Sequence, residues 1–210
     1  EVNRSYSPKE FIPVFHTWIQ DELVEDHLLI DVADYSHIPD GPGVMLIAHE
    51  GHFSLDQEKY QPGIMYMRKT KIEGEFIERF NQVLSITIEA ANRLRNFDII
   101  NDINFISNSF RFIANDRLYA ENTIDNQNLY KEEIQKVLNE KYPDSQVEYE
   151  DMSGKKERLA FTIRFNDGIN ILNIYICQMK YILVSFMFLF SNCSSLVQNQ
   201  GETQGTSYNI

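Results

Sequence analysis

The sequence predicts an α+β protein, a two-layer sandwich with about three helices packed on one face of a mainly antiparallel sheet. Three separated segments repeat apolar residues at helical spacing, and short runs with strand character, joined by short turns, lie between them. This order lacks the regular strand–helix–strand alternation that builds a doubly wound parallel sheet. A chain of 210 residues, 43% of them hydrophobic, is long enough for one well-packed core.

The first predicted helix begins at Ser7-Pro8, because serine suits the N-cap and proline suits the first helical position. It should extend to about Glu25. Its apolar face comprises Phe11, Val14, Phe15, Trp18, Ile19 and Leu23. A stripe of this kind must be buried against another element, so we expect Trp18 to lie in the core beside the sheet. The central apolar residues of that sheet should include Ile30, Val32, Leu46 and Ile47.

Three strands are expected before the second helix, at residues 28–33, 44–48 and 64–68. The first two are nearly continuous apolar runs, which is typical of strands in the interior of a sheet, and a loop rich in proline and glycine joins them. The third follows the turn residues Gln61-Pro62-Gly63.

The rest of the predicted domain alternates helices with pairs of strands. The second helix should run from Glu73 to about Asn96, and the third should end before Pro143. Strands are expected at residues 105–113 and 117–120, on either side of a turn at Asn115-Asp116. A closing hairpin is expected from strands at 146–150 and 159–165.

The composition excludes some classes of partner. The chain has 19 Lys+Arg against 31 Asp+Glu, and its net charge is −12. We therefore expect no nucleic-acid partner, because binding a polyanion requires a basic face. Cys177 and Cys193 are the two cysteines and both lie near the C-terminus, which leaves residues 1–168 without a disulfide and suits a reducing compartment. With no export signal at the front, a cytoplasmic location is expected.

Histidines and acidic residues gather in the first quarter of the chain, so a reactive site, if there is one, should lie there. His49 and His52 are three residues apart and would share a face on a helix, but in a strand they point to opposite sides. A site would therefore have to form across neighbouring strands. The candidate catalytic residues are Asp31, Asp34, His37, His49 and Glu50, and the candidate ligands of one divalent metal are His37, His49 and Asp34.

A structural role for the same residues is the competing interpretation, because polar groups at strand ends commonly satisfy backbone groups. No G-x-S-x-G, Walker or H-E-x-x-H pattern is present, and Gly41-Pro42-Gly43 precedes a strand rather than a helix. The leading hypothesis is therefore a small-ligand or partner-binding module without a cofactor. The alternative is a metal-assisted hydrolase or lyase that uses residues 31–52.

The blocks FIPVFHTWIQ, LLIDVADYSH and GPGVMLIAHE, together with Pro62–Lys69 and Asn115–Leu118, resemble a family of uncharacterised bacterial proteins. The resemblance covers approximately residues 11–165 and implies a bacterial, cytosolic, single-domain protein without implying a mechanism. Members of that family begin with one more strand and end soon after the last strand.

The C-terminal residues 169–210 are expected to lie outside the domain formed by residues 1–168. Met179-Lys180-Tyr181, the apolar run that follows and Cys193 resemble a bacterial lipoprotein signal, located at the opposite end of the chain from its usual place. A junction with a downstream reading frame would explain this order. A membrane-associated location through residues 169–190 is the alternative, although four polar residues make that segment a poor membrane-spanning helix.

Overall fold

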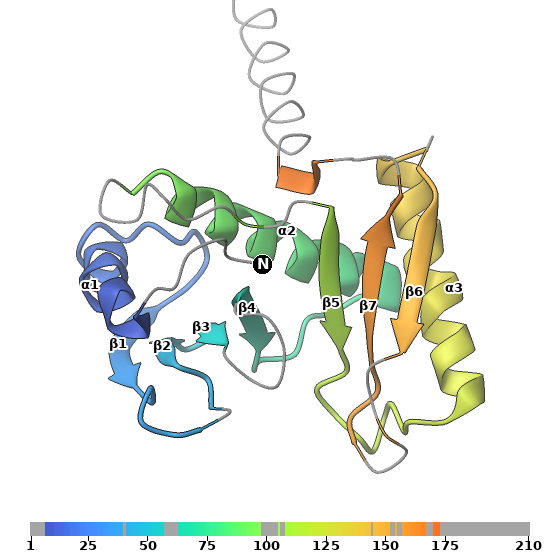
Figure 1. The fold of residues 1–210 in the computed structure, drawn as a ribbon, viewed down its shortest axis with the longest axis horizontal. Helices are drawn as coiled ribbons and strands as arrows, with labels where there is room; N and C mark the ends of the chain where they lie inside the picture. Colours follow the sequence, from blue (N-terminus) through green and yellow to red (C-terminus); the bar gives the residue numbers. More distant parts are fainter. Residues whose placement is uncertain are drawn as a thin grey trace, which may run out of the picture. The chain divides into compact units, whose positions relative to one another are not determined.

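The computed structural model of the chain describes residues 7–39, 41–56, 63–97, 105, 108–143, 145–151, 154, 157–166 and 170–172. The chain divides into two compact units, Glu1–Leu172 and Asn173–Ile210, and all of the described residues lie in the first. That unit contains helices packed on antiparallel sheets, which confirms the predicted α+β class (Figure 1).

The elements follow one another in the order helix, four strands, helix, strand, helix, two strands. The helices are α1 (Ile12–Gln20), which a short 3₁₀ turn at Pro8–Phe11 precedes, α2 (Phe76–Arg95) and α3 (Ile124–Lys141). The strands are β1 (Leu29–Asp34), β2 (Val44–Ala48), β3 (Gly51–Asp56), β4 (Gly63–Arg68), β5 (Ser109–Ile113), β6 (Val147–Asp151) and β7 (Ala160–Phe165).

The first helix packs on the first sheet through Trp18, as predicted. A capping box between Ser7 and Glu10 begins the helical segment, and Trp18 is 0% exposed. The Trp18 ring lies 5.5 Å from the ring of Phe15 and 6.0 Å from the ring of Phe53, measured between centroids and in edge-to-face geometry. The helix ends at Gln20, earlier than predicted, because Glu22 adopts a left-handed conformation with φ of 50°.

The first sheet has the strand order β1-β2-β3-β4, and every neighbouring pair is antiparallel. Leu46 is buried, Val32 packs against the core, and Ile47 is half-buried on the opposite face. The prediction for Ile30 was wrong, because its side chain is 55% exposed. The β1–β2 register shifts between Leu29 and Asp31, so Ile30 occupies a bulge that turns its side chain out of the alternating pattern.

Strand β3 was missed, and the predicted strand at residues 117–120 was wrong. β3 begins with Gly51-His52 and alternates polar with apolar residues, so its sequence looks like the polar end of β2. Residues 117–120 instead form a turn, in which the backbone N–H of Leu118 bonds to the Asp116 carboxylate and that of Ala120 to the Asp116 carbonyl. Of the predicted strand 105–113, the described strand comprises Ser109–Ile113.

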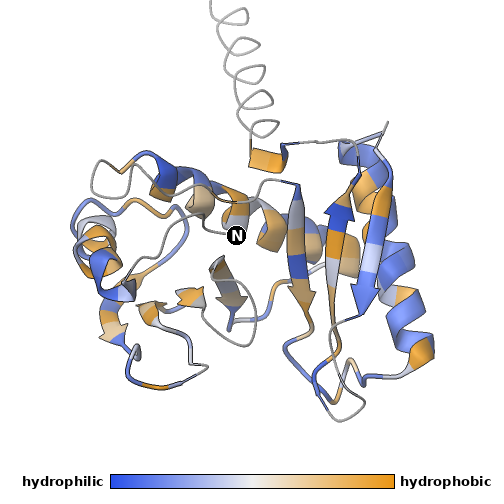
Figure 2. Cartoon of the chain, in the orientation of Figure 1, coloured by the Kyte–Doolittle hydropathy of each residue, from blue (hydrophilic) through white to orange (hydrophobic). Residues whose placement is uncertain are grey.

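The second sheet has the order β5-β7-β6, and the predicted β6–β7 hairpin is confirmed. Hydrophobic and hydrophilic residues alternate along β5, so one face of the sheet packs on helices while the other carries polar groups (Figure 2). Phe110 and Phe112 of β5 contact Phe80 of α2, at 6.3 and 6.0 Å between ring centroids. Helix α2 therefore packs against both sheets, since it also contacts β4.

The first unit extends slightly beyond the predicted boundary at residue 168. Ile171 and Leu172 are buried, and the Asn92 side chain of α2 donates a hydrogen bond of 3.2 Å to the carbonyl of Leu172. These two residues belong to the core rather than to a detached tail. The signal-like segment at residues 179–195 lies outside the described residues. No described helix has the length and apolar character needed to cross a membrane.

Candidate functional site

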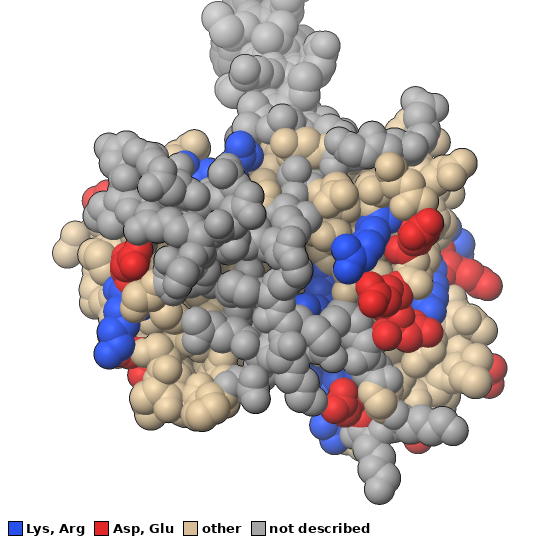
Figure 3. All heavy atoms as spheres, viewed as in Figure 1, with Lys and Arg blue, Asp and Glu red and all other residues tan. Residues whose placement is uncertain are grey.

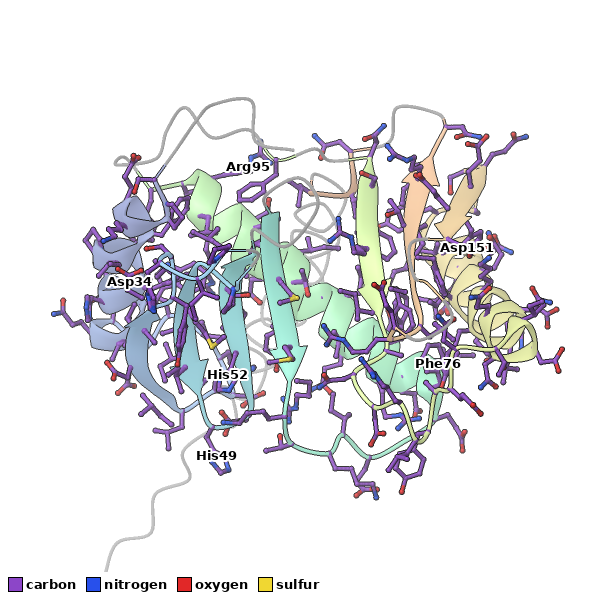
Figure 4. All side chains as sticks on the ribbon, turned by 60° about the horizontal axis from the view of Figure 1, so that its bottom comes forward. Asp34, His49, His52, Phe76, Arg95 and Asp151 are labelled. Carbon is purple, nitrogen blue, oxygen red and sulfur yellow. The ribbon has the colours of Figure 1, made fainter. Side chains whose placement is uncertain are left out.

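The five predicted candidate residues do not converge. Asp34 pairs with Val44 at one end of the β1–β2 ladder, whereas His49 and Glu50 follow Ala48 at the other end (Figure 4). At about 3.3 Å per residue, the two ends are roughly 15 Å apart. Asp31 and His37 are exposed, the first along β1 and the second in the turn after it.

Asp34 binds groups of its own loop. One carboxylate oxygen accepts hydrogen bonds from the Ser36 backbone N–H at 2.9 Å and from the Ser36 hydroxyl at 2.5 Å. The other lies 3.4 Å from the Lys9 ammonium. The Ser36 hydroxyl and N–H, assisted by Lys9, hold the pKa of the Asp34 carboxyl below its ordinary value.

Glu50 secures the opposite end of the ladder. Its carboxylate accepts a hydrogen bond of 2.7 Å from the N–H of Leu28, and its carbonyl accepts from the N–H groups of Lys69 and Thr70. Desolvation opposes the charged form, but the backbone N–H groups of Leu28 and Glu50 outweigh it and lower the pKa of the Glu50 carboxyl. Asp34 and Glu50 thus accept hydrogen bonds from backbone groups at strand ends, as the structural interpretation of these residues expects.

The predicted metal ligands His37, His49 and Asp34 are not brought together. Within the described ranges, no group of three or more His, Cys, Asp or Glu side chains is placed to hold a metal ion. His49 is exposed in the β2–β3 turn. The His52 side chain lies on the face of β3 opposite to that of the buried Phe53. Its Nδ1 has no hydrogen-bond partner among the described residues.

A partly buried polar cluster forms around Tyr66, a residue that sequence reasoning did not select. The Tyr66 hydroxyl oxygen lies 2.8 Å from Nε2 of His27 and accepts a hydrogen bond of 3.3 Å from the Arg68 guanidinium. Nδ1 of His27 lies 2.8 Å from the carbonyl of Glu25 and must donate to it, so Nε2 of a neutral His27 accepts a hydrogen bond from the Tyr66 hydroxyl. Burial raises the pKa of Tyr66.

Gly51 makes space for this cluster. A Cβ atom at position 51 would lie 2.8 Å from the Tyr66 hydroxyl oxygen and 2.8 Å from the carbonyl oxygen of Met67. His27 is separated from Tyr66 by 39 residues, so no local pattern in the sequence could have paired them.

A cavity of the described residues lies between the two sheets, and we call it the inter-sheet groove. Its volume is about 1140 Å³, and its walls are β4 on one side and β5 on the other. Helix α2 lies along it with four buried side chains, Phe80, Leu84, Ile88 and Ala91. The groove therefore has an apolar floor, and Tyr66 and Arg68 of the polar cluster contribute to one wall.

The groove is basic although the chain is acidic. Its described lining contains six basic residues, Arg68, Lys71, Arg79, Arg111, Arg158 and Arg164, against the two acidic residues Asp116 and Glu150. The whole chain has 19 basic and 31 acidic residues, so the sign of the charge balance is reversed in the groove. Glu150 is paired with Arg164 at 3.2 Å, and charges of both signs lie over the second sheet on the face shown in Figure 3.

Both walls of the groove are edge strands. β4 is the last strand of the first sheet and β5 is the first strand of the second. The side-chain amide of Asn115 donates a hydrogen bond of 3.1 Å to the carbonyl of Arg68, which ties the ends of the two strands together. The two strands run in the same direction, toward this link (Figure 4).

Comparison of the chain with protein-family models, with curated proteins and with solved structures found no match. The resemblance carried by the blocks at residues 11–165 therefore stays a prediction. The function has to be inferred from the geometry of the chain itself.

Proposed function

We propose that the chain is a binding module, that its site is the inter-sheet groove, and that its ligand is an amphipathic anion. The observation that carries the proposal is the combination of a cavity of about 1140 Å³, an apolar floor on α2 and six basic lining residues in a chain of net charge −12. Ligand sites are usually concave, mostly apolar and equipped with a few polar groups that orient the ligand.

Each part of the groove favours one part of such a ligand. Burial of an apolar body against Phe80, Leu84 and Ile88 gives a favourable free energy of about 25 cal/mol per Å² of apolar surface removed from water. Guanidinium groups such as those of Arg68 and Arg79 favour carboxylates and phosphates over neutral groups. Specificity for charge and affinity through apolar contact are thus provided by different side chains of the groove.

The alternative function, metal-assisted hydrolysis or elimination at residues 31–52, has less support. It requires Asp34 and Glu50 to act at one centre, but the β1–β2 ladder separates them and each carboxylate already accepts backbone hydrogen bonds. The binding-module hypothesis needs no such convergence.

The proposal is tested by filling the groove. Thr87 of α2 lines it, and its hydroxyl donates a hydrogen bond to the carbonyl of Val83 one turn earlier. Thr17 of α1 makes the same type of bond to Pro13 and is not among the groove residues, so it is a matched control. Binding of the anionic dye anilinonaphthalene sulfonate to the full chain should be at least about tenfold weaker in Thr87→Trp and unchanged in Thr17→Trp.

The charge requirement is tested on the same helix. Arg79 and Arg95 are both exposed on α2, but Arg79 lines the groove and Arg95 does not. Arg79→Gln should weaken dye binding about two- to fivefold, a range expected for one exposed ion pair, and Arg95→Gln should not. Equal affinity of the wild type and Thr87→Trp would place the dye elsewhere and contradict the proposed site.

A further inference from the structure

The two walls of the groove are end strands of different sheets, so each has one edge outside its own sheet. Each sheet is antiparallel internally, and β4 and β5 run in the same direction. A single added strand that runs opposite to both would pair antiparallel with β4 on one side and with β5 on the other. The four-stranded and three-stranded sheets would then become one continuous antiparallel sheet packed on α2.

We infer that the ligand of the inter-sheet groove is an extended polypeptide segment of a partner protein, bound as this added strand and carrying alternating apolar and acidic side chains. The inference rests on the proposed function and specifies the chemical class of its amphipathic anion. Edge strands present a row of backbone donors and acceptors, and peptides commonly bind by adding a strand to such an edge.

The face of β5 that contacts α2 indicates which side chains of the added strand should be apolar. Phe110 and Phe112 pair with Ile163 and Phe161 of β7, which are fully buried. On β4, the buried Tyr66 marks the same side of the first sheet. Side chains of an added strand that point to this side would contact the floor of the groove, including Leu84 of α2, and should be apolar.

The opposite face of β5 indicates that the other side chains of the added strand should be acidic. Arg111 of β5 pairs with Thr162 of β7, and Ser109 pairs with Arg164, so both arginines lie on the face away from α2. Alternate side chains of an added strand would point to this face. Carboxylates at those positions would lie on the side of both guanidinium groups, of which that of Arg164 also pairs with Glu150, whereas lysines there would meet like charge.

The dimensions fit a short segment. β4 has six residues and β5 has five, so a partner segment of about six residues would span both edges, a length of roughly 20 Å. A fatty acid could use the floor and the charge of the groove. It offers no backbone to the two edge strands, and for this reason we favour a polypeptide.

The experiment compares two peptides that differ only in the ability to pair as a strand. The first is a blocked, fluorescein-labelled peptide of about eight residues that alternates valine and glutamate. The second has the same sequence with N-methyl groups on all of its backbone amides, which removes the donors on both edges of the strand and keeps every side chain. Fluorescence polarisation with the full chain should show binding of the first and at least about tenfold weaker binding of the second.

Matched variants and a charge control locate the binding. Thr87→Trp should weaken binding of the first peptide and Thr17→Trp should not, since only Thr87 lines the groove. A peptide that alternates valine and lysine should bind at least about tenfold more weakly than the glutamate peptide, because the groove is basic.

Three outcomes would overturn the inference. Equal affinity for the methylated and unmethylated peptides would exclude strand addition while leaving the groove as a site for amphipathic anions. Dye binding that Thr87→Trp weakens, without binding of either peptide, would also exclude strand addition and leave the groove as a site for amphipathic anions. Sedimentation of the wild type as a dimer that Thr87→Trp dissociates would identify a second copy as the occupant. Equal dye affinity of the wild type and Thr87→Trp would instead contradict the proposed function itself.

Discussion

The strand-end region, residues 28–52, and the inter-sheet groove use charged side chains in opposite ways. In the strand-end region, the carboxylates of Asp34 and Glu50 accept hydrogen bonds from backbone groups close to them in the fold. In the groove, basic side chains from both sheets, from α2 and from loops line a cavity with an apolar floor. The first arrangement holds strands in place, and under the proposed function the second would offer charge to a ligand.

A concentration of reactive residue types in a sequence does not by itself mark a site. Asp31, Asp34, His37, His49 and Glu50 are close in sequence but lie along a β ladder and at both of its ends. The groove residues are distant in sequence and meet because α2 packs against both sheets. Changes in the first region should therefore affect folding, and changes in the second should affect binding.

The largest expected effect is on stability, at the helix that covers the first sheet. Trp18→Ala removes a fully buried ring that contacts Phe15 and Phe53. We expect the free energy of unfolding to fall by about 3–5 kcal/mol, from lost burial and the cavity left behind. Urea denaturation measures the loss. Dye affinity of the fraction that remains folded should equal that of the wild type, and a matched loss of affinity would show that the groove depends on the packing of α1 on the first sheet.

A smaller loss of stability is expected at the β3 glycine beneath Tyr66. Gly51→Ala places a Cβ within 2.8 Å of the Tyr66 hydroxyl oxygen and of a backbone carbonyl, and overpacking of this kind costs about 1–3 kcal/mol. Gly63→Ala in β4 is the control, because a Cβ at position 63 meets nothing within 4 Å. Thermal unfolding of the two variants compares the positions directly. Equal melting temperatures would mean that Tyr66 is not packed over Gly51.

The smallest effect concerns pH. The folded pKa of Glu50 lies below its ordinary value of 4.5, so its contribution to stability is complete above about pH 4.5 and is lost as pH falls through the folded pKa. Glu50→Gln should be less stable than the wild type at pH 7, and the difference should shrink towards about pH 2.5. Urea denaturation at both pH values gives the two differences. A difference that grows as the pH falls would have the wrong sign for this account.

Much of the fold was predictable because its elements carry local signals. The cap at Ser7 and the apolar stripe around Trp18 are readable in the sequence, and the class of fold follows from the order of such elements. Ile30 was misplaced because a bulge changes which face a residue takes, and a bulge depends on the pairing of two strands. The division into two sheets was also not predicted, since strand pairing is not a local property.

The candidate site was less predictable for the same physical reason. His27 and Tyr66 meet across 39 residues, and Arg68 and Arg111 face one groove from different sheets. Neither pair has a spacing that a sequence pattern could reveal. The one local signal of the groove was the amphipathic α2, whose apolar face is long enough to serve both sheets.

The central claim is that ligands bind between β4 and β5, and backbone amide hydrogen exchange of the full chain tests it most directly. With the valine–glutamate peptide added at saturation, protection should increase at Gly63–Arg68 and Ser109–Ile113, the two walls of the groove. β1 and β6, the outer strands of the two sheets, should be unchanged. Increased protection at residues 31–52 with no change in β4 and β5 would contradict the account and return the site to the region of the strand-end carboxylates.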